Sequence, residues 1–198
     1  ARWYAPAVAT ERVGAIIVSA GSSTRMDGID KTVAPLGGVP LGARTVEAFQ
    51  ASPVIDDIVL VVAQMHLSDI ADLAAGRGWG KVSAIRPGGQ RRQDSVRLGL
   101  AALEACEWVL VHDGARPLVS ERLITEGLDA ARETGAAIAA VRPKDTVKQL
   151  RADGGIGRTL NRDRLVSVQT PQVFRRSLLE QAHAAIARDV TDDAAMVE

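Results

Sequence analysis

Cysteine, aromatic residues and excess charge are all scarce in this sequence of 198 residues. The single cysteine, Cys106, excludes an intramolecular disulfide framework and zinc sites built from several cysteines, and it fits a reducing cytoplasm. Aromatic residues make up only 3% of the chain, so stacking on a run of nucleic-acid bases is not expected. The 24 basic and 24 acidic side chains cancel, which argues against a nucleic acid as partner.

Long apolar runs are also lacking, because none reaches the roughly 18 residues that a membrane-spanning helix needs. Residues 1–12 mix charge with proline and have no apolar core of signal-peptide length, so we interpret them as a tail. We therefore expect no membrane partner and a cytoplasmic location.

Short apolar runs alternate with longer amphipathic stretches over the first two thirds of the chain. With 46% apolar residues, the chain can bury a core, and its length suits one domain over residues 1–198. The expected strands are 13–19, 58–63, 81–85, 108–111 and 136–141. The expected helices are about 40–51, 66–76, 91–106 and 120–134. This alternation predicts an α/β fold, a mostly parallel sheet with helices on both faces.

The alternation stops at about residue 143. Up to about residue 170 the sequence is polar, and the pair Gly154-Gly155 predicts a hairpin turn. We interpret 143–170 as an arm that projects from the sheet and could pair with a second copy of itself. Further along, Thr191-Asp192-Asp193 predicts a helix start, with an N-cap followed by acids in the first turn.

The first stretch with chemical potential follows the first predicted strand. Ser19–Met26 reads Ser-Ala-Gly-Ser-Ser-Thr-Arg-Met, and its small residues would let backbone N–H groups approach an anion. Arg25 and Lys31 add two cations. We favour a phosphate-binding loop over a plain polar connection.

The second stretch, Pro87–Ser95, combines Gly88-Gly89 with arginines and the serine of a helix start. A Gly-Gly turn can read the edge of a nucleobase through its backbone. A solvated, arginine-rich helix start explains the same residues equally well.

The third stretch, Val111–Pro117, places Asp113 at the end of a buried strand beside Arg116. Mg²⁺ prefers one or two carboxylates together with substrate phosphates, which suits Asp113, while Arg116 suits an anionic substrate group. The alternative is a surface ion pair of little energetic worth. We prefer a site, because the other candidate loops also follow strands of the same sheet.

These motifs, taken in order, resemble the 2-C-methyl-D-erythritol 4-phosphate cytidylyltransferase family. The resemblance rests on the three stretches above and on Asp-Thr-Val-Lys, Gln-Thr-Pro-Gln-Val-Phe and Thr-Asp-Asp-Ala, and it runs from Val13 to Ala195. It implies a Rossmann-like nucleotidyltransferase fold with a projecting β-arm and a homodimer joined through the arms. It also implies Mg²⁺ and the reaction of CTP with 2-C-methyl-D-erythritol 4-phosphate, in non-mevalonate isoprenoid synthesis.

The resemblance also assigns roles to residues. Arg25 and Lys31 match the basic pair that stabilises the transition state. The positions that match the CTP pocket are Ser19, Ala20, Gly21, Gly89, Gln90, Ser95 and Gly114. Asp113 matches the carboxylate for metal and substrate. The positions that match the sugar-phosphate side are Arg116, Thr146, Thr170 and Thr191, with Arg162 matching an arm residue that reaches the partner subunit's site.

The sequence departs from the family pattern in a few places. Gln90 stands where an aspartate is common, and the spacing from Met26 to Lys31 is one residue shorter than in some members. The family also has a further C-terminal stretch with a substrate-binding lysine, which we expect to follow Glu198.

Other functions share parts of this pattern. A ribitol-5-phosphate cytidylyltransferase would share the CTP loops and differ on the sugar side. A molybdenum-cofactor-type guanylyltransferase would share the small-residue loop, but the Thr-Pro-Gln motif argues against it. A non-catalytic nucleotide-binding dimer remains an alternative of another class.

Overall fold

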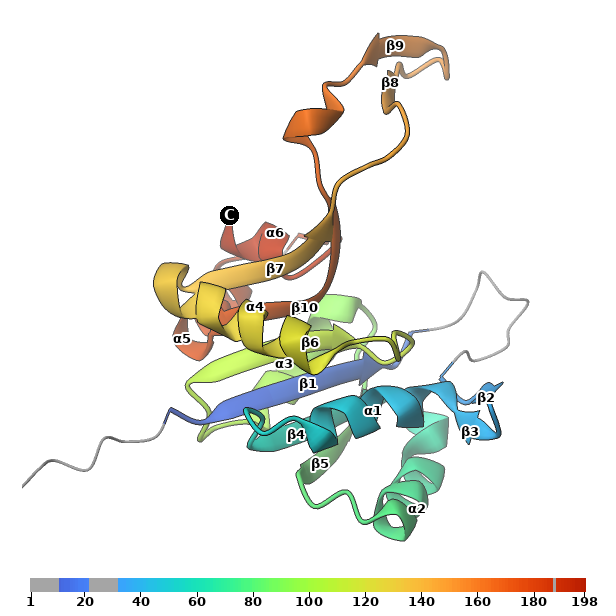
Figure 1. The fold of residues 1–198 in the computed structure, drawn as a ribbon, viewed down its shortest axis with the longest axis vertical. Coiled ribbons are helices and arrows are strands. Elements are labelled where there is room, and N and C mark those ends of the chain that lie inside the picture. The colour runs from blue at the N-terminus through green and yellow to red at the C-terminus, as the bar shows by residue number, and fades with distance from the viewer. Residues whose placement is uncertain (1–10, 22–31, 187) are drawn as a thin grey trace, which may run out of the picture.

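The computed structural model describes residues 11–21, 32–186 and 188–198. Its centre is a six-stranded sheet in the order β5-β4-β1-β6-β10-β7 (Figure 1). The bounds of these strands are β1 Val13–Ser19, β4 Asp57–Val62, β5 Val82–Pro87, β6 Trp108–Asp113, β7 Ala136–Val141 and β10 Ser167–Arg175. β5, β4, β1 and β6 run parallel, whereas β10 runs antiparallel to both of its neighbours. The expected mostly parallel sheet is confirmed.

Helices cover both faces of this sheet, and each face has its own apolar core (Figure 1). Neighbouring residues of a strand point to opposite faces, so Ile17 belongs to one core and Ile16 to the other. The first core packs on α1 (Leu41–Ala51), α2 (Leu67–Arg77) and α4 (Glu121–Thr134). The second core packs on α3 (Arg92–Ala101), α5 (Arg176–Ala185) and α6 (Ala194–Val197).

The strand order creates a switch point between β1 and β6. From β1 the chain proceeds to β4 and β5 on one side, and it then returns to place β6 on the other side of β1. Val18 near the end of β1 pairs in register with Asp113 at the end of β6. In open α/β sheets ligands bind at the carboxyl ends of strands at such a switch point. The fold therefore directs attention to the residues that follow β1, β5 and β6.

Most predicted elements agree with the structure to within two residues. The clearest difference in a helix is 91–106, because α3 ends at Ala101 and the remainder forms turns, although Leu103 is still buried. A short hairpin of β2 (Pro35–Leu36) and β3 (Val39–Pro40) precedes α1 and has no counterpart in the prediction.

β10 and α5 have no counterpart among the elements predicted from the sequence. β10 contains Pro171, which cannot donate to a strand ladder, and Gln172, a polar residue that is buried here. The pairing with β7 shifts between Val168 and Gln172, so Pro171 lies where the regular ladder is interrupted. Because a proline and a buried glutamine interrupt the apolar residues of β10, apolar periodicity does not predict this strand.

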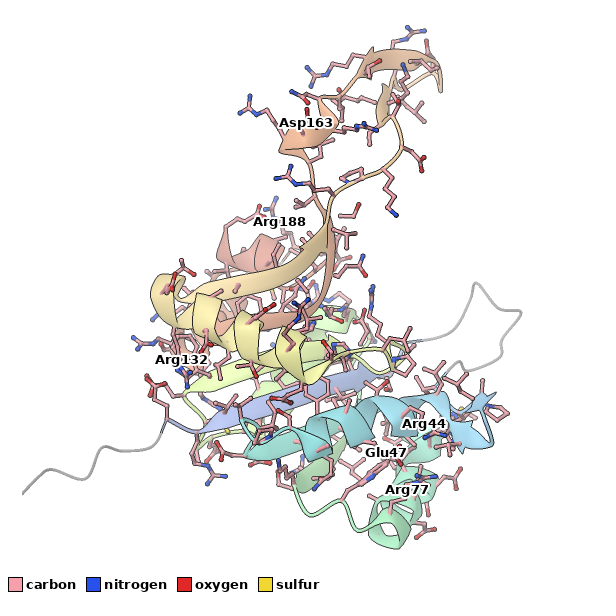
Figure 2. All side chains as sticks on the ribbon, viewed as in Figure 1. Arg44, Glu47, Arg77, Arg132, Asp163 and Arg188 are labelled. Carbon is pink, nitrogen blue, oxygen red and sulfur yellow. The ribbon has the colours of Figure 1, made fainter. Side chains whose placement is uncertain are left out.

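The predicted hairpin at Gly154-Gly155 is confirmed. β8 (Lys148–Leu150) and β9 (Ile156–Thr159) pair antiparallel, and Gly154 adopts φ 81°, a backbone conformation that favours glycine. The hairpin stands well away from the sheet, followed by a short 3₁₀ helix, η3 (Arg162–Arg164) (Figures 1 and 2).

The predicted helix start at Thr191 is wrong by a few residues. α6 begins at Ala194, and the Asp192 carboxylate, not Thr191, accepts a hydrogen bond from the Ala195 N–H at 3.2 Å. Asp193, expected as an acid in the first turn of that helix, is buried. In the part of the chain that the structure describes, every helix is too short or too polar to cross a membrane.

Packing of α3 on the sheet generates a stability prediction. A Cβ added to Gly99 would lie 2.5 Å from Ile16 Cγ2 and 3.2 Å from Val61 Cγ2, both in the second core. We expect Gly99→Ala to lower the free energy of unfolding in urea by about 1–3 kcal/mol, the usual cost of overpacking. Gly76→Ala in α2 is the matched control, because nothing lies within 4 Å of its added Cβ. Helix propensity should make this control neutral or stabilising by up to about 1 kcal/mol. Equal stabilisation by both substitutions would contradict this account of the packing.

Candidate active site

The loops that follow β1, β5 and β6 touch one another at the switch point. A Cβ on Gly114 would lie 1.8 Å from Ser19 Oγ, and a Cβ on Gly88 would lie 2.0 Å from Ala20 Cβ. A side chain at Gly88 would require the backbone to move, and one at Gly114 would displace the Ser19 hydroxyl, so the loops approach with backbone against side chain. The predicted nucleotide-site residues near these contacts are Ser19, Ala20, Gly21, Gly89, Ser95 and Gly114.

Hydrogen bonds fix the Gly88-Gly89 turn. The Gly88 N–H donates to the Val62 carbonyl at 2.9 Å, and the Gly89 N–H donates to Ser95 Oγ at 3.1 Å. Ser95 is buried, so water competes little with its hydroxyl for the Gly89 N–H, and this hydrogen bond holds the turn in place. Gln90 follows the turn and is exposed.

The arginines at the start of α3 are paired with carboxylates. The Arg91 guanidinium bonds Asp94 at 2.8 and 2.9 Å and Asp189 at 2.9 Å. Its hydrogen bonds lower the pKa of Asp94 to about 2. Arg92 bonds the carboxylate of Asp193. The local excess of positive charge seen in the sequence is therefore partly balanced by acids from the C-terminal segment.

Asp113 lies at the end of β6 between two guanidinium groups. Arg116 Nε donates to Asp113 Oδ2 at 2.8 Å, and Arg92 Nη2 lies 3.5 Å from Asp113 Oδ1. The Asp113 N–H donates to Thr170 Oγ1 at 3.3 Å. Arg116 also bonds Gln169 of β10. Asp113 therefore has polar contacts with α3, β10 and the loop that follows β6, which an isolated surface ion pair would not have.

A hollow of about 500 Å³ opens beside Asp113. Its lining brings together the predicted substrate residues Asp113, Arg116, Thr170 and Thr191, and adds Arg92 and Gln172. This volume lies in the range typical of small-molecule sites. Thr146 and Arg162 are on the arm, outside this lining, and Arg162 instead bonds the Lys144 carbonyl.

His112 is buried next to the site. Its ring packs 5.0 Å from that of Phe49, and burial lowers the pKa of His112 to about 4. His112 Nε2 lies 3.1 Å from the Arg116 carbonyl oxygen, which can only accept a hydrogen bond. The neutral imidazole therefore donates from Nε2 and supports the loop that carries Arg116.

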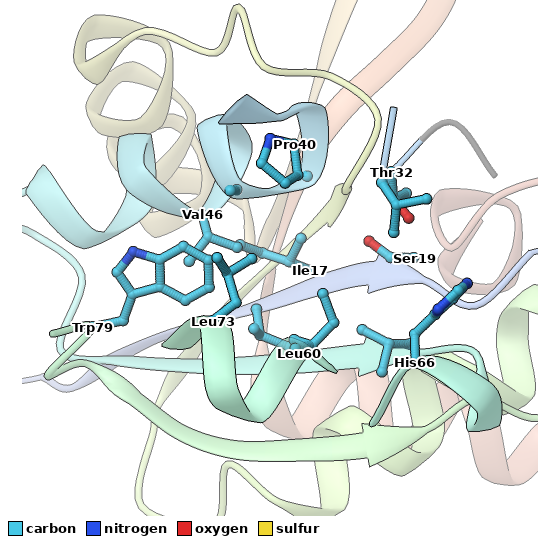
Figure 3. Close-up of a pocket in the computed structure, with 14 residues that line it drawn as sticks. Ile17, Ser19, Thr32, Pro40, Val46, Leu60, His66, Leu73 and Trp79 are labelled. Atoms are coloured by element: carbon cyan, nitrogen blue, oxygen red, sulfur yellow. The ribbon is translucent and has the colours of Figure 1, made fainter. Parts of the chain in front are cut away.

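A second, smaller cavity lies on the α1 and α2 side of the sheet (Figure 3). Ser19, Thr32 and His66 lie at one end and Trp79 at the other, with apolar side chains between them. At about 30 Å³ it has room for roughly two water molecules and no substrate. The hollow beside Asp113 is the better candidate.

A magnesium site at Asp113 is compatible with the residues present. Across residues 11–21, 32–186 and 188–198, no group of three or more His, Cys, Asp or Glu could hold a metal ion. Mg²⁺ does not need such a group where substrate phosphates supply the other oxygens. Asp113 offers one carboxylate at the edge of the hollow, which suits that form of binding.

Several residues at the site were not predicted from the sequence. The stretch Pro87–Ser95 included Arg92 without giving it a role, and nothing in the sequence marked Gln172 or Asp193 as buried polar groups. Arg25 and Lys31 lie outside the described residues.

Comparison with known proteins identifies the family. Residues 13–198 match the IspD family, described as 2-C-methyl-D-erythritol 4-phosphate cytidylyltransferase. A protein of that name from Dehalococcoides mccartyi (strain CBDB1) is 50% identical over 188 residues, 95% of this chain and 83% of the relative.

Solved structures agree. The 4-diphosphocytidyl-2C-methyl-D-erythritol synthase from Anaerococcus prevotii DSM 20548 has a TM-score of 0.83 and 32% identity, over 94% of this chain and 82% of that one. The 2-C-methyl-D-erythritol 4-phosphate cytidylyltransferase from Thermus thermophilus has a TM-score of 0.72 and 29% identity, over 94% of this chain and 83% of that one. This chain belongs to the 2-C-methyl-D-erythritol 4-phosphate cytidylyltransferase family.

Proposed function

We propose that this protein joins CTP and 2-C-methyl-D-erythritol 4-phosphate into 4-diphosphocytidyl-2-C-methyl-D-erythritol and pyrophosphate, a step of non-mevalonate isoprenoid synthesis. The observation that carries the proposal is the convergence of the β1, β5 and β6 loops beside a hollow lined by Asp113 and Arg116, in a chain of this family.

The chemistry is a displacement at phosphorus. An oxygen of the alcohol phosphate attacks the α-phosphorus of CTP, and the bond to the β-phosphate oxygen breaks to release pyrophosphate. The attacking oxygen is already anionic, so a strong general base is unnecessary. The main obstacle is the approach of two polyanions, which makes positioning and charge neutralisation the chief tasks of the protein.

We assign the nucleotide to the loop side of the site. Ser19, Ala20, Gly21 and the Gly88-Gly89 turn would surround it, with Gly114 leaving room at the back. Ser95 would act by holding the Gly89 N–H. Gln90 is exposed at this side and is our candidate for a base contact.

We assign the alcohol phosphate to the hollow, where Arg116, Thr170 and Thr191 can bind its oxygens and Asp113 can accept from its hydroxyls. Mg²⁺ held by Asp113 and the substrate phosphates would supply further positive charge. Arg25 and Lys31 are assigned to stabilising the charge that develops in the transition state.

The arm is our candidate for a dimer contact. Leu150, Ile156 and Val166 are exposed apolar side chains along it, and contiguous exposed apolar groups often mark interaction surfaces. In a homodimer joined there, Arg162 would reach the partner subunit's site. A cytoplasmic location also stays a proposal, supported by the single thiol, Cys106, which is buried.

Pyrophosphate release tests the function. With CTP and Mg²⁺, we expect release in the presence of 2-C-methyl-D-erythritol 4-phosphate and little with ribitol 5-phosphate. Release with ribitol 5-phosphate alone would overturn the choice of alcohol. CTP binding without release for either alcohol would instead favour a non-catalytic nucleotide-binding dimer.

The proposed basic pair generates a second prediction. We expect Arg25→Ala and Lys31→Ala each to lower turnover by about 10²–10³-fold, as for loss of a preorganised stabilising group. Arg122→Ala on α4, where the side chain is 84% exposed, is the matched loss of a cation and should leave turnover unchanged. If both site variants turn over like the wild type, Arg25 and Lys31 do not have this role.

A further inference from the structure

Arg92 connects two carboxylates that come from distant parts of the chain. One terminal nitrogen bonds Asp193 Oδ2, and the other lies 3.5 Å from Asp113 Oδ1. Asp113 ends β6, whereas Asp193 lies 80 positions further along, in the C-terminal segment. A planar, fork-shaped guanidinium can span two such groups at once, which a lysine ammonium cannot do in the same way.

The Asp193 carboxylate depends on this arginine. Its side chain is only 1% exposed, and burial raises the pKa of Asp193 while the Arg92 guanidinium opposes that rise. Asp193 Oδ1 has no hydrogen-bond partner within residues 11–21, 32–186 and 188–198. A buried acid of this kind is strongly destabilising once its counter-charge is removed. Asp193 in turn holds the guanidinium where it meets Asp113.

Two buried glutamine side chains form hydrogen bonds with the C-terminal segment on both sides of Asp193. Gln93 donates to the Arg188 carbonyl at 3.1 Å and accepts from the Val190 N–H at 3.2 Å. Gln172 donates to Asp192 at 2.9 Å and accepts from the Ala194 N–H at 3.0 Å. Hydrogen bonds therefore hold the C-terminal segment, residues 188–194, against α3 and β10.

This arrangement fixes one wall of the hollow. Thr191 and Asp192 of the C-terminal segment line the hollow. Arg92 of α3 and Asp113 of β6 line it as well. Arg116 holds one oxygen of Asp113, and Arg92 faces the other. With an arginine on each oxygen, the Asp113 carboxylate has a defined orientation.

We propose that Arg92 is a positioning residue for the transfer reaction, which orients the Asp113 carboxylate and ties it to the wall that carries Thr191. The inference rests on the proposed function and adds a role that goes beyond the substrate contacts. Arg92 acts through Asp113, so the benefit of Arg92 should vanish when Asp113 can no longer act as a carboxylate.

A double-mutant cycle tests this dependence. We expect Arg92→Gln to lower kcat/KM for the alcohol phosphate by about 10–100-fold, the usual cost of losing a group that orients a site ligand. In an Asp113→Asn background the same substitution should cost less than about twofold, because the two losses are not independent. Arg97→Gln on the same helix, 65% exposed, is the control and should behave like the wild type.

A second variant separates positioning from folding. Arg92→Gln alone leaves Asp193 buried without its counter-charge and should lower the melting temperature. Arg92→Gln combined with Asp193→Asn removes both charges, so it should recover much of the melting temperature while turnover stays low.

If Arg92→Gln combined with Asp193→Asn recovers turnover as well as melting temperature, the inference is overturned. It is also overturned if the fold-losses in kcat/KM from Arg92→Gln and Asp113→Asn multiply when the two substitutions are combined. A wild-type protein that releases no pyrophosphate would overturn the proposed function, and this inference with it. A wild-type enzyme that is active while Arg92→Gln is equally active would overturn the inference alone.

Discussion

Close contact between loops at the β1–β6 switch point determines how the rest of the site is arranged. Gly88 lies so close to Ala20 that a Cβ would force the backbone to move, and Gly114 lies so close to Ser19 that a Cβ would displace its hydroxyl. Backbone from β5 and β6 is thereby pressed onto the end of β1, where N–H groups and small side chains can surround a nucleotide. The two apolar cores on either side of the sheet hold the strands whose ends make these contacts.

Charge pairing is the second constraint on the site. Arg91, Arg92 and Arg116 all bond carboxylates within the chain, so the arginines are held in place before any substrate arrives. Preorganised charges of this kind need no rearrangement when two polyanions meet. The buried pair of Arg92 and Asp193 extends this order to the C-terminal segment and so to Thr191.

Much of this architecture could be predicted from the sequence, because buried parallel strands read as short apolar runs and the helices between them have clear apolar faces. The loops after β1, β5 and β6 were predictable for the same reason, since small residues and charges follow those runs. β10 was not, because Pro171 and the buried Gln172 break the pattern. The contact between Arg92 and Asp193 was also out of reach, since only the folded chain brings residues so far apart together.

Hydrogen exchange of the protein with and without CTP and Mg²⁺ would test most directly whether the converging loops form one nucleotide site. We expect CTP to slow exchange together in peptides covering residues 19–21, 88–96 and 113–116, while α4 exchanges as before. Protection confined to one of these segments, or centred on α4, would contradict the claim that they bind the nucleotide as a unit.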